Sequence, residues 1–305
     1  MHLAVTVVAV AASFAQPAPA AGLDLGNAAG YGIAFAGRGS SLKINNGPIV
    51  GNPLVGDGTT VTTSGGGNGQ VIGTIITDGS VPQRAFSGLQ TPPGAGQFNP
   101  VTPSCVSDAV ASAATVSAYA AGLSANQTFT NTTTATTFDR TIGSGVYVID
   151  VNKIQNADLT LKGGADDFFE VNVSQNFRTN QQITLDGVAA SNVLFNFTAS
   201  SGNVLQTSGG NELSGTFLAT NGGNLQVSEL DLTGSLINTA GLIEFVSVSH
   251  LTEAAPVPVP KPSIWVMLWA GVGLAYLRPG PCSGRGSARY MSWVAASDTT
   301  SVSCP

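Results

Sequence analysis

The residues best suited to chemistry in this sequence are a few carboxylates and one histidine. Asp166, Asp167 and Glu170 lie within five residues of one another. Paired carboxylates serve glycosidases as acid and base, and oxygen ligands in turns bind Ca²⁺. His250 is the only histidine after His2, so a Ser-His-Asp or Cys-His device would have to use it. Nothing in the sequence brings a nucleophile to His250, and an acidic turn before a strand needs no function. We therefore predict no catalytic residue, no metal site and no cofactor.

The basic residues and the cysteines add little support for an enzyme or a metal protein. Solenoid lyases combine carboxylates with Lys or Arg, yet only Lys153, Lys162 and Arg178 lie near the acidic cluster. The three cysteines, at positions 105, 282 and 304, form no CxxC pair and no Cys/His cluster, so no zinc site is expected. The net charge is −6, with 11 basic and 17 acidic residues. Without a basic cluster, binding to nucleic acid is not expected, because it depends on contacts to phosphate.

Threonine is the other residue type whose spacing suggests a function. Ice-binding solenoids present flat, regularly spaced rows of Thr, and this chain has Thr-rich tracts at residues 59–63 and 132–137. In the later part of the chain, the threonines are not expected to recur at one strand position; these are Thr160, Thr184, Thr198, Thr207, Thr216 and Thr233. Thr is also simply a favourable outward residue in a strand. Ice binding is therefore an alternative hypothesis and not the leading one.

The composition predicts a mainly β fold with many short strands and tight turns. Only 9% of the 305 residues are charged, against roughly 25% in an average soluble protein, whereas 43% are apolar and 38 are Gly. Between residues 146 and 250, apolar or β-branched runs recur about every 10 to 12 residues, with Gly- and Asn-rich turns between them. Shorter runs at residues 33–35, 42–44, 59–63 and 71–76 predict further strands. Two architectures fit, a parallel β-solenoid and a β-sandwich.

An Ala-rich segment at residues 107–123 differs from the rest of the chain and predicts the one substantial helix. Val110, Tyr119 and Leu123 fall roughly on one helical face. A helix of this kind can lie along the flank of a solenoid and cover its apolar surface, and for that reason the solenoid is favoured over the sandwich.

The alternation of side chains within the strands predicts which of them form the core. Phe169 and Val171 alternate with Glu170 and Asn172 in one strand, and Phe195 and Phe197 follow the same pattern in another. Residues two apart in a strand point to the same face. The four apolar residues Phe169, Val171, Phe195 and Phe197 are therefore expected inside.

Several stretches together resemble one family of bacterial surface proteins. They are LDLGNAAGYGIAFAG (residues 23–37), the Ala-rich helix, GVYVIDV (145–151), SNVLFNF (191–197) and LSGTFLATNGGNLQVSELDLTGSLI (213–237). In combination they resemble the choice-of-anchor A domain over most of residues 22–250. The resemblance implies a right-handed β-solenoid related to adhesive domains, and it supplies no catalytic residues.

The two ends of the sequence suggest export. Residues 1–21 contain an uncharged apolar run followed by Ala and Pro, which is typical of a secretory signal. After the solenoid domain, expected at residues 22–252, come a Pro-rich linker (253–263), a short hydrophobic helix (264–278) and an irregular tail (279–305). The linker and short helix resemble a PEP-CTERM sorting tail, and an ordinary membrane anchor or hydrophobic hairpin is the alternative. The apolar run is shorter than the roughly 20 residues that span a bilayer, so only transient membrane contact is expected.

These observations favour a non-enzymatic adhesive protein at the cell surface or in the extracellular matrix. The expected partners are extracellular polysaccharide or cell-surface components. An ice-binding protein is the first alternative, and a polysaccharide-active β-helix enzyme is a less favoured one.

Overall fold

The computed structural model describes most of the expected solenoid domain. The described residues are 33–35, 40–45, 47–50, 52–63, 69–78, 98–101, 103–140, 146–247 and 249–252. The expected signal segment (1–21), linker (253–263), hydrophobic helix (264–278) and tail (279–305) lie outside them. None of the helices in the described part of the chain is long and apolar enough to cross a membrane.

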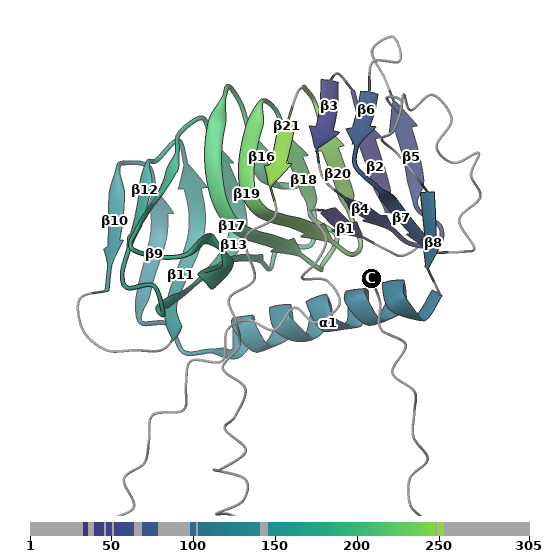
Figure 1. Cartoon of the computed structure of the whole chain (residues 1–305). Coiled ribbons are helices and arrows are strands. Elements are labelled where there is room, and N and C mark those ends of the chain that lie inside the picture. The colour runs from purple at the N-terminus through teal and green to yellow at the C-terminus, as the bar shows by residue number, and fades with distance from the viewer. Residues whose placement is uncertain are drawn as a thin grey trace, which may run out of the picture. The chain divides into compact units, whose positions relative to one another are not determined.

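The domain is a parallel β-solenoid with a single α-helix along one side (Figure 1). Every strand pairing in the described residues is parallel. β-Sandwiches are built from antiparallel sheets, so the sandwich alternative is excluded. The predicted right-handed parallel solenoid with one flanking helix is confirmed.

The strands stack in three ladders, which we call faces A, B and C. Face A contains, in spatial order, β9 (Gln127–Thr132), β11 (Val146–Gln155), β13 (Phe168–Thr179), β15 (Val193–Phe197), β17 (Asn211–Ala219), β19 (Leu230–Asn238), β1 (Ile33–Phe35), β4 (Pro53–Val55), β7 (Ile75–Asp78) and β8 (Phe98–Val101).

Face B begins with the later halves of β11 and β13. It continues through β16 (Asn203–Thr207), β18 (Asn224–Val227), β20 (Leu242–Phe245), β2 (Ser41–Ile44) and β5 (Thr60–Thr63).

Face C begins with β10 (Thr136–Asp139), β12 (Leu159–Lys162) and β14 (Ile183–Asp186). These three strands form a sheet of their own, and β14 contacts β17 without a described strand pairing between them. The second part of face C comprises the first halves of β17 and β19, then β21 (Ser249–Thr252), β3 (Gly47–Val50) and β6 (Gly69–Ile72). A short 3-10 helix, η3 (Ala190–Asn192), precedes β15.

Glycine lets single strands turn from one face to the next without a loop. β17 and β19 each run from face C into face A, and they bend at Gly215 and Gly234, which are paired in register and have φ values of 121° and 145°. A similar change occurs at Gly73 (φ 152°). The run at residues 71–76, which the sequence predicts as one strand, is therefore divided between β6 and β7.

The chain does not build the solenoid in sequence order. Residues 127–252, the C-terminal array, stack turn upon turn, and residues 33–101, the N-terminal array, continue the stack beyond the last of these turns. At the junction, which we call the seam, β1 pairs with β19, β2 with β20 and β3 with β21. Helix α1 (Pro103–Gly122) then returns along the outside to the first turn (Figure 1).

The interior is filled by the apolar side chains that alternate along the strands. Phe169, Val171, Phe195 and Phe197 are fully buried in this core, as the sequence predicts. Phe177, Phe195 and Phe217 form an aromatic group with ring centroids 4.8–6.3 Å apart.

Helix α1 covers face A, so the outward residues of that face form a second core. Val106, Ala113 and Ala120 pack against outward residues such as Leu218 and Ile237. The helix begins at Pro103, four residues before the predicted start at 107. Pro is favourable at the first position of a helix because its φ is already helical and because the N–H that it lacks would have no partner within the helix. Its role as a cover for the solenoid flank is as predicted.

Candidate functional site

The acidic cluster at residues 166–170 does not form a catalytic pair. Asp167 accepts a 2.7 Å hydrogen bond from the N–H of Gly164 and lies 3.3 Å from Nε of Arg140. Asp166 is exposed in the same turn, whereas Glu170 belongs to a strand beneath helix α1. Asp167 thus stabilises a turn, and its carboxylate is already paired.

Glu170 is the most unusual ionisable group in the described residues. It is 1% exposed, and its Oε1 atom has no hydrogen-bond partner. Burial raises the pKa of Glu170 to about 7; a hydrogen bond with Asn172 opposes this shift, and the charge of Asp150 adds to it. Because this side chain is buried, its carboxyl group is not placed to meet a substrate.

His250 does not form part of a catalytic triad or dyad in the described residues. It lies on β21 with its Nδ1 3.0 Å from Oδ1 of Asp231 on β19, and both side chains are more than half exposed. No group of three His, Cys, Asp or Glu residues in the described segments could hold a metal ion. The basic residues do not gather around the acidic cluster: Lys162 lies 3.8 Å from Asp139 on face C, whereas Lys153 and Arg178 lie on the adjacent strands β11 and β13 of face B.

Beneath helix α1, polar residues replace apolar ones in one column of face A. Asp150, Asn172 and Asn196 are paired in successive strands. The Nδ2 of Asn172 donates to Oδ1 of Asp150 (3.1 Å), and the Nδ2 of Asn196 donates to Oδ1 of Asn172 (2.9 Å). Ser117 of the helix donates to Oδ1 of Asn196 at 2.7 Å. These contacts fix α1 to face A and leave faces B and C as the two faces available for binding.

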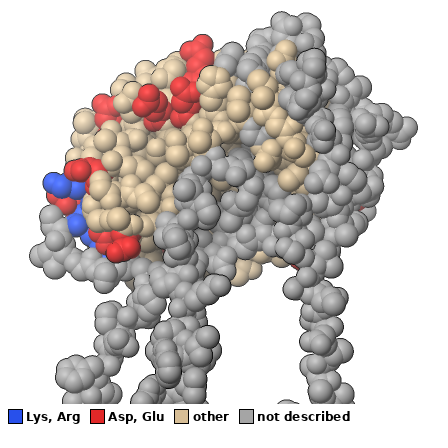
Figure 2. Space-filling model, in the orientation of Figure 1, with Lys and Arg blue, Asp and Glu red and all other residues tan. Residues whose placement is uncertain are grey.

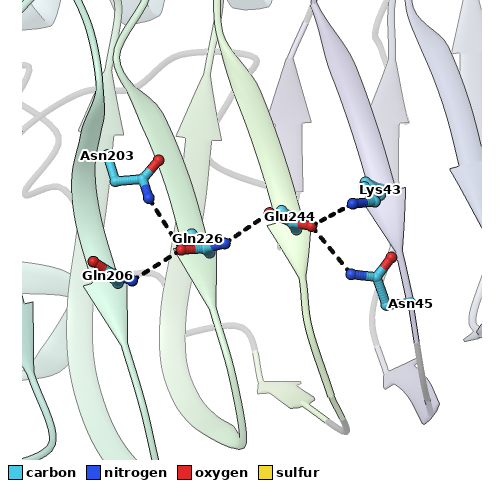
Figure 3. A network of polar contacts seen from close by, with 6 residues as sticks. All are labelled: Lys43, Asn45, Asn203, Gln206, Gln226 and Glu244. Atoms are coloured by element: carbon cyan, nitrogen blue, oxygen red, sulfur yellow. Dashed lines mark hydrogen bonds and ion pairs between the residues drawn. The ribbon is translucent and has the colours of Figure 1, made fainter. Parts of the chain in front are cut away.

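Face B carries a continuous ladder of polar side chains (Figure 3). We call it the face-B ladder, and its members are Asn203, Gln206, Gln226, Glu244, Lys43 and Asn45. The Oε1 of Gln226 accepts hydrogen bonds from Asn203 and Gln206, both at 3.0 Å. Its Nε2 donates to Oε2 of Glu244 at 2.8 Å. Each bond crosses from one strand to the next, so the ladder runs across the strands.

Glu244 is the charged centre of this ladder. Its Oε1 accepts from Nζ of Lys43 at 2.7 Å and from Nδ2 of Asn45 at 3.1 Å. Burial alone would raise its pKa, but the hydrogen bonds from Lys43, Gln226 and Asn45 and the charge of Lys43 hold the pKa of Glu244 below its usual value. The carboxylate therefore stays ionised and orients the amides around it.

Face C carries rows of hydroxyl groups. Thr137, Thr160 and Thr184 are paired in register on β10, β12 and β14, and a second row comprises Ser214, Thr233 and Thr252 on β17, β19 and β21. The prediction that Thr160 and Thr184 would not share a strand position is therefore wrong. The turns of the solenoid differ in length, so a constant spacing in the sequence does not reveal the register.

Face C also carries more charge than face B. Its outward positions include Asp139, Lys162, Asp186, Glu212 and Asp231. Figure 2 shows acidic side chains over several parts of the visible surface, and Lys and Arg in that view lie only at the end where β10 and β12 are found. The hydroxyl rows are thus interspersed with carboxylates.

A regular, charge-poor solenoid with exposed polar faces agrees with the family comparison. The model of a family described as "Putative Ice-binding-like adhesive domain" matches residues 12–238, well over half of the chain. The chain belongs to this family. A comparison with curated proteins finds no match.

Solved structures of ice-binding proteins share the fold of this ice-binding-like adhesive domain. One from an Antarctic biological consortium is 15% identical with a TM-score of 0.54, over 82% of this chain and 97% of that one. One from the Antarctic ascomycete Antarctomyces psychrotrophicus is 17% identical with a TM-score of 0.51, over 77% and 100%. One from an Antarctic Flavobacteriaceae bacterium is 17% identical with a TM-score of 0.52, over 78% and 48%. At these identities the similarity establishes a common fold.

Sequence reasoning missed the face-B ladder of this adhesive domain. Gln206 and Gln226 are 20 residues apart, and Glu244 follows 18 residues later. The similar runs NVLQT at residues 203–207 and NLQV at 224–227 are the signal that could have indicated aligned amides. Lys43 and Asn45 could not have been added, since they reach Glu244 across the seam.

Proposed function

We propose that this domain is a non-enzymatic adhesive module that binds extended, hydroxyl-rich surfaces such as extracellular polysaccharide. The face-B ladder carries the proposal, because it places amide groups side by side on successive strands of one face. Parallel strands lie about 4.8 Å apart, so the amides form a regular row. Membership of an ice-binding-like adhesive family supports the same conclusion.

Ice is the second candidate ligand, and a specific observation favours it. The rows Thr137–Thr160–Thr184 and Ser214–Thr233–Thr252 place outward hydroxyl groups on successive strands of face C. The solved structures that share the fold are described as ice-binding proteins. The carboxylates between the rows make face C less uniform than a surface of Thr alone.

An enzymatic role has less support from the described residues. Asp167 is paired with Arg140 and the N–H of Gly164, and Glu170 is buried. The acid and base of a glycosidase have to flank the scissile bond together, and these two carboxyl groups do not share an open surface.

Retention on solid polysaccharide tests the proposed function. The full-length protein is mixed with cellulose, agarose beads and calcium alginate gel, and both the bound fraction and the released reducing ends are measured. We expect retention on at least one matrix and no reducing ends. Steady release of reducing ends would replace the adhesive function with an enzymatic one. Thermal hysteresis in a freezing assay without retention on any matrix would favour ice.

We further propose that the protein is exported and held at the surface, as the choice-of-anchor A and PEP-CTERM resemblances imply. The support is in the sequence: an apolar run within residues 1–21 and a short hydrophobic segment at 264–278 behind a Pro-rich linker. Mass spectrometry of the protein from an exporting bacterial host should place the mature N-terminus between Gln16 and Gly22. An intact Met1 would contradict export.

A further inference from the structure

The three faces of the solenoid offer different surfaces to a partner. Face A is covered by α1, and face C carries the carboxylates of Asp139, Asp186, Glu212 and Asp231. Face B has two outward columns on β16, β18, β20, β2 and β5. They are Asn203, Asn224, Leu242, Ser41 and Thr60, and beside them Gln206, Gln226, Glu244, Lys43 and Thr62.

The outward columns of face B are almost free of net charge. Their only charged members are Glu244 and Lys43, which form an ion pair at 2.7 Å. On the two strands that begin face B, Arg178 of β13 is exposed beside Gln206, and Lys153 of β11 is half-buried at an outward position. An anionic polymer would gain little from the ladder, because the charge of Lys43 is compensated and the two other basic residues, Lys153 and Arg178, lie on β11 and β13 at one end of the face.

The hydrogen bonds of the ladder hold its amides in place before a ligand arrives. Gln226 is held by Asn203, Gln206 and Glu244. A free Gln side chain loses rotamer entropy when it is ordered, and binding is stronger when such ordering has already occurred in the free protein. Glu244 is in this sense a positioning residue.

The ordered amides retain hydrogen-bonding capacity. A carboxamide has two N–H donors and an oxygen with two lone pairs. Gln206 uses one donor in the ladder and Gln226 uses one donor, which leaves one N–H on each, together with the carbonyl oxygen of Gln206. Neighbouring outward positions repeat about every 4.8 Å across the strands and about every 6.6 Å along them. Hydroxyl groups on successive sugar rings can meet such a grid, and the apolar side chain of Leu242 can contact ring C–H groups.

We propose that face B binds a neutral, hydroxyl-rich polysaccharide whose chain lies across the strands along the face-B ladder. This assignment rests on the proposed adhesive function and names its surface and its class of ligand. Each contact is weak, so affinity accumulates over several turns of the solenoid. Since no uncompensated cluster of charge takes part, binding changes little with salt.

The test compares two matched double variants of the full-length protein. Gln206→Ala with Gln226→Ala removes ladder amides, and Thr184→Ala with Thr233→Ala removes hydroxyls from face C. Retention is measured on cellulose and agarose, which are neutral, and on calcium alginate, which is anionic, at about 0.01 M and 1 M salt. We expect the ladder variant to bind the neutral matrices at least about tenfold more weakly, which corresponds to 1.4 kcal/mol, and the face-C variant to bind like the parent.

The outcomes separate this inference from the proposed function. Parent-like binding by a folded ladder variant, or loss of binding in the face-C variant alone, would overturn the assignment to face B and leave adhesion intact. Retention on alginate alone that disappears at high salt would overturn the neutral ligand. A parent protein that no matrix retains would overturn the adhesive function itself. Unchanged thermal unfolding of both variants serves as the folding control.

Discussion

The rings of Phe195 and Phe217, on adjacent turns of the solenoid, lie parallel with their centroids 4.8 Å apart and an angle of 4° between their planes. Both are fully buried. Phe177 contacts both rings from a third turn. In this part of the interior, three successive turns each contribute one ring to a single aromatic group.

Truncation of one of the stacked Phe rings should destabilise the fold. We expect Phe195→Ala to lower the free energy of unfolding by about 3–5 kcal/mol, because it removes buried area and leaves a cavity. Denaturant unfolding measures the change. Tyr119→Ala, on the exposed side of α1 (61% exposed), is the matched control and should change stability little. A Phe195→Ala protein as stable as the parent would contradict its place in the core.

Stability should fall as the pH rises because of Glu170. The pKa of Glu170 is raised from 4.5 to about 7 in the fold, so the folded state prefers the protonated form. The resulting stabilisation is fully present below pH 4.5 and is lost between pH 4.5 and 7, by about 3 kcal/mol in total. Glu170→Gln should remove this dependence and be more stable than the parent at pH 8.

The control for this pH effect is Glu212→Gln, an exposed residue of face C. Its unfolding free energy should follow the pH dependence of the parent. Parallel curves for the parent and Glu170→Gln between pH 4 and 8 would show that Glu170 does not titrate in this range.

The glycine corner between faces C and A should not accept a side chain. A Cβ atom on Gly234 would collide with the carbonyl group of Gly215 in the turn beside it, and the φ of 145° is itself unfavourable for other residues. Gly202 also has a positive φ (74°), but a Cβ atom there would meet no atom within 4 Å beyond its chain neighbours. Gly202→Ala should cost about 1–2 kcal/mol from φ alone, and Gly234→Ala should cost clearly more. Equal melting temperatures would refute the steric argument.

The hydrogen bonds that Asn196 makes between α1 and face A should stabilise the attachment of the helix more than an apolar side chain at the same position would. Asn196→Leu would place there the residue type that Leu218 provides one turn later. It would remove the donor to Oδ1 of Asn172 and the acceptor of the Ser117 hydroxyl, which would keep only the hydrogen bond that it accepts from Thr220. Unsatisfied buried groups cost about 1–3 kcal/mol. Hydrogen exchange of the α1 amides should accelerate, whereas Ser200→Ala in an exposed turn should not change it. Slower exchange in Asn196→Leu would contradict a fixing role for Asn196.

The sequence predicts the solenoid well where the pattern is local. The alternation of Phe169 and Val171 with Glu170 and Asn172 gives the inward and outward sides of β13 correctly. It does not reveal that the outward side is also buried, because Glu170 and Asn172 lie under a helix some 50 residues earlier in the chain. Whether an outward residue meets water depends on what covers the strand.

The parts that could not be predicted depend on register between distant strands. The ladder joins Glu244 to Lys43 across 201 positions, and no local period relates them. The two hydroxyl rows on face C could not be predicted for a related reason, because the number of residues per turn differs between them. Thr137, Thr160 and Thr184 are 23 and 24 residues apart. In the other row, Ser214, Thr233 and Thr252 are each 19 residues apart. Because the turns vary in length, rows of residues that are in register in the fold show no constant spacing in the sequence.

The seam has a consequence for how the protein acquires its structure during synthesis. Ile33 pairs with Pro53 on one side and with Leu236 on the other, so the second partner of this strand appears only after nearly the whole domain has been translated. Contacts between such distant residues slow folding. The strands of each array pair with one another, but the seam between the two arrays can form only when residues 230–252 are present. The joining of the two arrays is therefore a late event, which has to follow the synthesis of almost the entire domain.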